Sequence, residues 1–141
     1  MSEGLQELLA WTGVLLFAIG LVGGFAIPVL KSPRIGLSAH TAAIQSGLAL
    51  IALAWVGGRL TLSDGWAAAI AHTAWLSLYV LWLGLMVGAY FGTGRTLPIA
   101  GAGHVGEPWQ ERLALLLIGA SSVGSAAAFV MLLIQWSWRV S

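Results

Sequence analysis

Histidine is the side chain best suited to chemistry near neutral pH, and this 141-residue chain has three histidines, His40, His72 and His104. His40 follows the run Lys31-Ser-Pro-Arg-Ile-Gly-Leu-Ser-Ala, which predicts a position just inside the start of an apolar helix. An imidazole inside a membrane segment costs free energy and is by default a functional-site hypothesis. The alternative is a histidine that reaches the membrane interface or bonds a backbone carbonyl. His40 is the first candidate for chemistry in this chain.

Other polar side chains are expected in the same half of the membrane as His40. At 1.5 Å per residue, Gln45 and Ser46 lie about 7.5–9 Å deeper than His40. Tyr79 falls near the middle of a later apolar run, and its alternative role is a buried tyrosine whose hydroxyl bonds a carbonyl. Arg95 and His104 lie in a loop on the His40 side, where an arginine also serves to anchor lipid headgroups. His72 is predicted nearer the opposite end of its helix, where a structural role is favoured.

Helical geometry divides these residues between faces. At about 100° per residue, His40, Ala43 and Gly47 share one face, whereas Gln45 and Ser46 point more than about 100° away from His40. A site that used all of them together would draw on more than one protomer. Ala43 and Gly47 carry little side chain, so we expect a shallow groove in which a flat macrocycle could lie with His40 as its axial ligand.

The elements that must position these residues are membrane helices. The chain is 59% hydrophobic and 8% charged, far from the roughly 25% charged residues of a soluble domain. A spanning helix needs about 20 mostly apolar residues. Four runs qualify: Leu8–Leu30, Ser38–Leu60, Trp66–Phe91 and Trp109–Trp138. We therefore predict an all-α integral membrane four-helix bundle, with residues 1–141 as one domain.

The ends of these runs carry the features expected at membrane interfaces. Tryptophans near the run ends are typical of an aromatic belt; they are Trp11, Trp66, Trp109, Trp136 and Trp138. The membrane side that holds the connections between spans 1 and 2 and between spans 3 and 4 carries four Lys and Arg residues. The opposite side carries two. By the positive-inside rule this places those connections in the cytoplasm, most simply of a bacterial inner membrane.

Composition excludes several classes of protein. The chain has no cysteine, so it has neither a disulfide framework nor a thiolate metal site. Its net charge of +1 gives no sign of nucleic-acid binding. The acidic N-terminal residues lack the positive region of a cleavable signal, so the first run is predicted to be a retained helix. Lipid is the expected surrounding.

Small residues suggest close packing, either within one bundle or between copies. Gly20-Leu-Val-Gly-Gly24 and Gly119-Ala-Ser-Ser-Val-Gly-Ser125 form faces on which helices can approach closely. Four helices leave little interior room, so a pocket formed with a second protomer is the other interpretation.

The polar residues argue against familiar four-helix classes. Proton-coupled small multidrug transporters need a carboxylate in the first span, and Leu8–Leu30 has none. A bis-histidine cytochrome needs paired imidazoles, but the three histidines lie at different levels. The acidic residues all fall at ends or in loops, and no Ser-His-Asp arrangement is visible. A haem with one histidine, a metal-free pocket and a non-catalytic haem-binding or scaffold subunit remain open.

Motifs in two loops carry a family resemblance. They are Ser32-Pro-Arg-Ile-Gly-Leu-Ser-Ala-His40 with Gly47, Gly92-Thr-Gly-Arg-Thr-Leu-Pro-Ile-Ala-Gly-Ala-Gly-His104, and Pro108-Trp-Gln-Glu111. With them the chain resembles the hydroxylaminobenzene mutase family of four-span membrane enzymes. More distantly it is similar to styrene oxide isomerase, through Leu21-Val-Gly-Gly-Phe25, His40 with Gly47, and Gly103-His104-Val-Gly106.

The resemblance implies an isomerase. It implies transfer of a hydroxyl group from nitrogen to the ring of an arylhydroxylamine, giving a 2-aminophenol, and a haem b whose iron is a Lewis acid held by His40 in a homotrimer. It also implies a catalytic tyrosine that matches Tyr79. We expect Tyr79, with Gln45 or Ser46, to orient the substrate and help move a proton. The chain departs from the family at Ser46, where asparagine is usual, which leaves the substrate open. The alternative reaction is isomerisation of an aryl epoxide to an aldehyde.

Overall fold

The computed structural model describes residues 1–101 and 103–137, and the regular elements of this part of the chain are all helical. The four long helices are α1 (Glu3–Gly23), α2 (Pro33–Arg59), α3 (Asp64–Phe91) and α4 (Pro108–Ser137). A short 3₁₀-helix, η1 (Gly24–Val29), follows α1. Each long helix is long and apolar enough to cross a membrane. The predicted all-α membrane architecture with four spans is confirmed.

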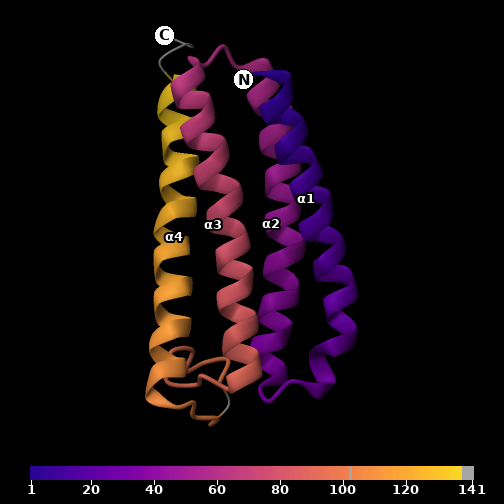
Figure 1. The fold of residues 1–141 in the computed structure, drawn as a ribbon, viewed down its shortest axis with the longest axis vertical. Coiled ribbons are helices and arrows are strands. Elements are labelled where there is room, and N and C mark those ends of the chain that lie inside the picture. The colour runs from indigo at the N-terminus through magenta and orange to yellow at the C-terminus, as the bar shows by residue number, and fades with distance from the viewer. Residues whose placement is uncertain (102, 138–141) are drawn as a thin grey trace.

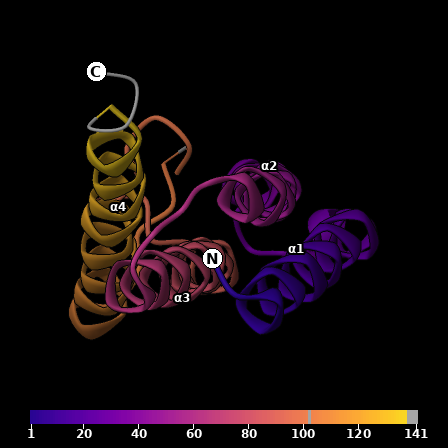
Figure 2. The same ribbon diagram turned by 90° about the horizontal axis from the view of Figure 1, so that it is seen from above.

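The helices run up and down side by side along the long axis of the molecule (Figure 1). Seen from above, they form two pairs, α1 with α2 and α3 with α4, and the contact of α2 with α3 joins the pairs (Figure 2). In the described part of the chain, α4 packs against α3 and against no other helix. The N-terminus and the α2–α3 turn lie at one end, and the α1–α2 and α3–α4 connections lie at the other (Figure 1).

Local sequence sets where the helices begin and end, and it moves several boundaries from the predicted positions; the first helix, for example, begins at Glu3 and not at Leu8. The second helix begins at Pro33 and not at Ser38, because proline has no N–H to lose in a first turn and its fixed φ suits a helix start. His40 is therefore about 10 Å inside α2 rather than a few ångströms. The first span ends as a 3₁₀-helix that contains Pro28, which cannot donate to an α-helical bond. Gly92 ends α3 in the left-handed conformation, with φ of 71°.

Glycine permits a close approach of two helix backbones where α1 crosses α2. A Cβ added at Gly47 would lie 2.6 Å from the carbonyl oxygen of Gly13 and 2.6 Å from the backbone nitrogen of Phe17. One turn and more toward the α1–α2 turn, a Cβ at Gly20 would lie 3.0 Å from the Cβ of Ala43. Larger side chains at these positions would force the two backbones apart. The small residues therefore fix the spacing of α1 and α2.

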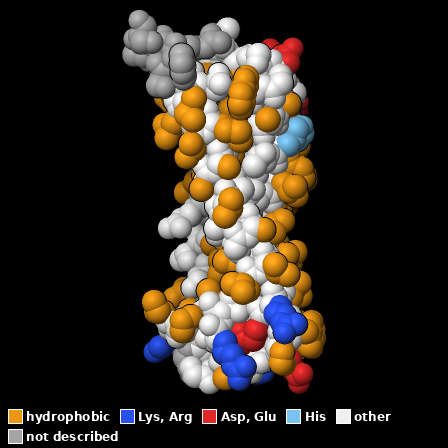
Figure 3. All heavy atoms as spheres, turned by 90° about the vertical axis from the view of Figure 1, so that its left-hand side faces the viewer, with side chains coloured by type: hydrophobic (Ala, Val, Ile, Leu, Met, Phe, Trp, Pro, Cys, Tyr) orange, Lys and Arg blue, Asp and Glu red, His pale blue; other side chains and the backbone are white. Residues whose placement is uncertain are grey.

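The surface matches a lipid environment along its length and water at its ends. In Figure 3, hydrophobic side chains cover the middle of the displayed face, and Lys and Arg gather at the end with the α1–α2 and α3–α4 connections. The described tryptophans predicted for the aromatic belt are between 42% and 65% exposed; they are Trp11, Trp66, Trp109 and Trp136. Trp138 lies outside the described residues. The charge bias and the belt fit helices that cross a bilayer.

Candidate functional site

His40 is held against α1 by one of its two ring nitrogens. Its Nδ1 lies 2.7 Å from the carbonyl oxygen of Gly20, and the side chain is half-buried. A carbonyl oxygen only accepts, so Nδ1 carries the proton of this hydrogen bond. In the neutral imidazole, the Nε2 lone pair is then free to accept a proton or bind a metal. The carbonyl bond that the sequence left open as an alternative is present, and it is compatible with a ligand role.

The groove predicted beside His40 over Ala43 and Gly47 is filled in the structure. Both residues are buried, and α1 occupies the space above them through Gly13 and Gly20. The reason is that small residues on both helices let the two backbones approach closely. Ala43 and Gly47 thus bring the Gly20 carbonyl to His40 and leave no macrocycle-sized space on this face. Beside the imidazole lies Gly24, where a Cβ would be 3.0 Å from His40 Cε1.

Tyr79 bonds the same helix at a different level. Its hydroxyl donates to the carbonyl oxygen of Thr12 at 2.7 Å, as the alternative role for this tyrosine predicted. The hydroxyl oxygen keeps lone pairs that can accept a further hydrogen bond. Thr12 and Gly20 are eight residues apart on α1, so the anchors of Tyr79 and His40 are separated by about 12 Å along that helix. His40 of α2 and Tyr79 of α3 are therefore both bonded to α1, but these bonds do not bring the two side chains into contact.

Ser46 and Gln45 lie on different sides of α2, whereas the helical angles predicted only that both point away from His40. Ser46 is buried, 5% exposed, on the side of α2 that packs into the bundle. Gln45 is exposed on the outer side of α2, near the middle of the helix. An amide at mid-helix facing lipid has no water to bond, so it favours a polar partner from another molecule.

The α3–α4 loop is organised by Glu111, a residue that sequence reasoning classed only as an end-of-helix acid. Its carboxylate accepts backbone N–H groups from Arg95 at 3.2 Å, Thr96 at 2.8 Å and Gly106 at 3.0 Å. The Thr96 hydroxyl donates to it at 2.7 Å. Glu111 itself is 8% exposed. The sequence signal was available, since a glutamate in the first turn of a helix accepts N–H groups favourably.

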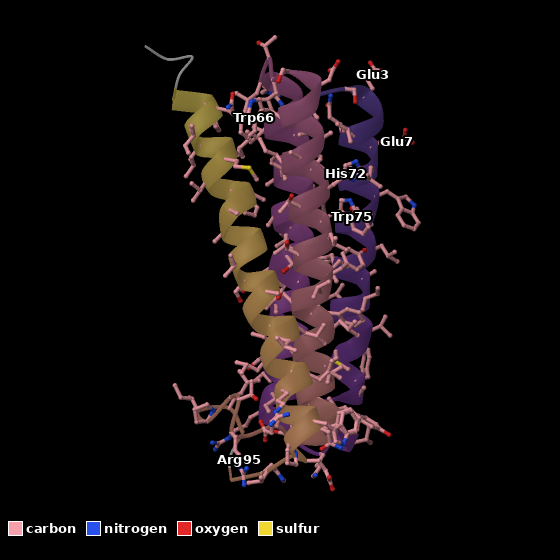
Figure 4. The ribbon with its side chains drawn as sticks, turned by 60° about the vertical axis from the view of Figure 1, so that its left-hand side comes forward. Glu3, Glu7, Trp66, His72, Trp75 and Arg95 are labelled. Carbon is pink, nitrogen blue, oxygen red and sulfur yellow. The ribbon has the colours of Figure 1, made fainter. Side chains whose placement is uncertain are left out.

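The loop residues predicted for the site lie at the His40 end of the molecule. The Arg95 side chain is exposed and extends from the loop at that end (Figure 4). His104 is half-buried, and a Cβ added at Gly92 would lie 3.2 Å from the His104 Cβ. The described contacts of these two side chains do not reach His40. Arg95 takes part in the fold through its backbone N–H group.

His72 lies at the other end, as predicted. It is exposed on α3, and its Nδ1 accepts the indole N–H of Trp75 at 3.1 Å (Figure 4). Within residues 1–101 and 103–137, no three His, Asp or Glu side chains gather closely enough to hold a bare metal ion.

Comparison with known proteins identifies the family. The family model described as styrene oxide isomerase matches residues 5–137. The chain belongs to the styrene oxide isomerase family. It is 36% identical over 134 residues to hydroxylaminobenzene mutase HabA of Ectopseudomonas oleovorans, covering 92% of this chain and 97% of HabA. It is 34% identical over 128 residues to hydroxylaminobenzene mutase HabB of the same organism, covering 90% of this chain and 77% of HabB. No solved structure matches the chain.

These matches confirm the resemblance inferred from the loop motifs. Four membrane-length helices and membership of a family of isomerases make the chain a multi-pass membrane isomerase. The reaction is isomerisation, which needs no external oxidant or reductant.

Proposed function

We propose that this protein isomerises arylhydroxylamines, such as hydroxylaminobenzene, to 2-aminophenols within the membrane. The observation that carries the proposal is the match to two hydroxylaminobenzene mutases over at least 90% of this chain. In the proposed reaction the N–O bond breaks and a C–O bond forms at the ortho carbon. The ortho ring proton is lost and the nitrogen gains one, so that the atoms and electrons balance without a co-reactant.

We further propose that His40 would hold a haem b, on a side of the imidazole other than the Ala43–Gly47 face that α1 fills. The bond from Nδ1 to the Gly20 carbonyl fits this role, because metal-binding histidines usually donate their other ring N–H to such an acceptor. Bound there, haem iron would supply a Lewis acid toward the hydroxylamine oxygen.

The remaining site residues act on the organic part of the substrate. The Tyr79 hydroxyl donates a hydrogen bond to Thr12, so its oxygen is placed to accept a hydrogen bond from an N–H or O–H group of a substrate. To move a proton, the hydroxyl would give its own proton to the substrate nitrogen and recover one from the ortho ring carbon. Ser46 and Gln45 supply a hydroxyl and an amide that can orient the hydroxylamine. Ala43 and Gly47 contribute indirectly, by allowing α1 to present the Gly20 carbonyl to His40. Arg95 and His104 lie in the α3–α4 loop, at the end of the bundle where the polar group of a substrate would enter the site.

A homotrimer is part of this proposal, because one chain does not bring the residues together. The anchors of His40 and Tyr79 are about 12 Å apart along α1, and Gln45 faces outward from α2. A neighbouring copy would give the Gln45 amide a polar partner and enclose the substrate away from bulk water. We place the Lys- and Arg-rich end of each copy on the cytoplasmic side of a bacterial inner membrane.

The test is conversion of phenylhydroxylamine by membranes that contain the protein. 2-Aminophenol should form without added nucleotide or reductant, and membranes lacking the protein are the control. The purified protein should show a Soret band that His40→Ala removes or shifts and His72→Ala retains. A colourless active enzyme would rule out the haem, and an inactive preparation with normal folding would rule out the mutase activity.

The second candidate reaction is isomerisation of an aryl epoxide to an aldehyde. It is favoured by the family model itself, which is described as styrene oxide isomerase and covers residues 5–137. Styrene oxide offered to the same membranes distinguishes the two reactions by the product. Conversion of neither substrate would favour a non-catalytic haem-binding or scaffold subunit.

A further inference from the structure

The bond between His72 and Trp75 fixes both side chains on the outer face of α3. The indole N–H can only donate, so His72 Nδ1 must be its acceptor at 3.1 Å. His72 is therefore neutral in this arrangement, with its proton on Nε2. Figure 4 shows the two side chains together, well away from the loop end where Arg95 lies. A histidine facing lipid is costly, and the bond to Trp75 is the interaction that its position provides.

Trp75 also contacts the candidate catalytic tyrosine, Tyr79. Its ring lies edge to face with the ring of Tyr79, with 6.1 Å between ring centroids and 82° between planes. The Tyr79 hydroxyl in turn donates to Thr12 at 2.7 Å. Residues 72, 75 and 79 are spaced by three and four, so they lie on one face of α3. Three contacts thus form one chain from His72 to the α1 backbone.

We propose that His72 is a positioning residue for Tyr79, acting through Trp75. The imidazole gives the indole N–H a partner on a lipid-facing surface where there is no water to accept it. Without that partner, the indole would turn toward another acceptor and leave the Tyr79 ring without its edge contact. Tyr79 would then have only its hydroxyl bond to set its orientation. The role of His72 is to hold the Tyr79 oxygen in one place relative to the substrate.

This inference rests on the proposed isomerase reaction, so its first readout is independent of activity. The chain has two tyrosines, Tyr79 and Tyr90, and protein labelled with 3-fluorotyrosine should give two ¹⁹F resonances. Tyr90 pairs with Phe91 about 16 Å further along α3 and serves as an internal reference. His72→Leu should shift or broaden the Tyr79 resonance and leave the Tyr90 resonance in place.

Conservative variants separate positioning from a loss of folding. The side-chain oxygen of His72→Asn can occupy the place of Nδ1 and accept the indole N–H, so it should restore the wild-type Tyr79 resonance. Trp75→Phe should move that resonance as His72→Leu does. Trp66 is an exposed tryptophan nearer the start of α3. Trp66→Phe should therefore move neither resonance.

Turnover of phenylhydroxylamine completes the test. Losing one neutral hydrogen bond behind the tyrosine should lower kcat by about 2- to 10-fold in His72→Leu, with most of the loss recovered in His72→Asn. An unmoved Tyr79 resonance would overturn the inference, as would a moved resonance with unchanged kcat. An inactive wild-type protein in which the Tyr79 resonance still responds to His72 would instead overturn the proposed function.

Discussion

Replacing Gly47 by alanine should destabilise the protein through the α1–α2 crossing. The added Cβ would lie 2.6 Å from the Gly13 carbonyl oxygen and 2.6 Å from the Phe17 nitrogen. Both atoms are backbone, so no side chain can turn away to make room. Reaching an ordinary contact of 3.4 Å requires the two helices to separate locally by about 0.8 Å.

The cost of this separation can be worked out in both stability and site geometry. Overpacking in a close-packed interior costs about 1–3 kcal/mol, and the higher helix propensity of alanine returns up to about 1 kcal/mol. If α1 moved as a rigid body by 0.8 Å directly away from α2, the His40–Gly20 bond would lengthen from 2.7 Å to about 3.5 Å. At that length the bond no longer orients the imidazole. The substitution should therefore weaken the site as well as the fold.

The measurement is the free energy of unfolding in mixed micelles, followed by the helical signal. Because the two atoms met by the new Cβ are backbone and cannot turn aside, the upper part of the overpacking range applies, about 2–3 kcal/mol. After a propensity gain of about 1 kcal/mol, Gly47→Ala should lower the free energy of unfolding by about 1–2 kcal/mol. Gly65→Ala is the matched control, because a Cβ at Gly65 meets nothing within 4 Å. That control should be neutral or slightly stabilising. Equal stability of Gly47→Ala and wild type would refute the assignment of this crossing as the contact that sets helix spacing.

Three further substitutions test separate parts of the structure. Tyr79→Phe should slow turnover by about 10²–10⁴-fold if the hydroxyl moves a proton, and an unchanged rate would remove Tyr79 from the chemistry. Glu111→Gln leaves a loop donor without its acceptor and should destabilise the loop by about 1–3 kcal/mol, seen as faster proteolysis within residues 92–107. Glu107 is exposed, so Glu107→Gln should not speed proteolysis, and equal cleavage of the two variants would contradict the role given to Glu111. Gln45→Leu should shift native mass spectra from trimer toward monomer, and a persistent trimer would place the interface elsewhere.

The four helices could be predicted from sequence because hydrophobic length alone specifies a membrane span. The end of the bundle at which each candidate residue lies follows from its position along its helix. His40 and His72 fall toward opposite ends of the molecule, as their positions in the apolar runs predicted. These features depend on one helix at a time. They need no knowledge of which helix packs on which.

The contacts between helices could not be predicted in the same way. Gly47 and Ala43 suggested an open groove, but the same small size lets a neighbouring helix fill the space. Which of these occurs depends on Gly13 and Gly20 in α1, whose pairing with α2 is a long-range choice. The carbonyl partners of His40 and Tyr79 are backbone groups, which carry no residue-type signal at all. Glu111 was underestimated because its donors come from a loop whose path the sequence pattern does not specify.

Oxygen labelling of the product tests the central claim, an intramolecular transfer in an enclosed membrane site. Phenylhydroxylamine carrying ¹⁸O in its hydroxyl group is incubated with the purified protein in ordinary water, and the 2-aminophenol is analysed by mass spectrometry. The account predicts that the ortho product retains the ¹⁸O label and that little para isomer forms. An ortho product carrying solvent oxygen would contradict the intramolecular route, and a mainly para product would indicate attack by free water.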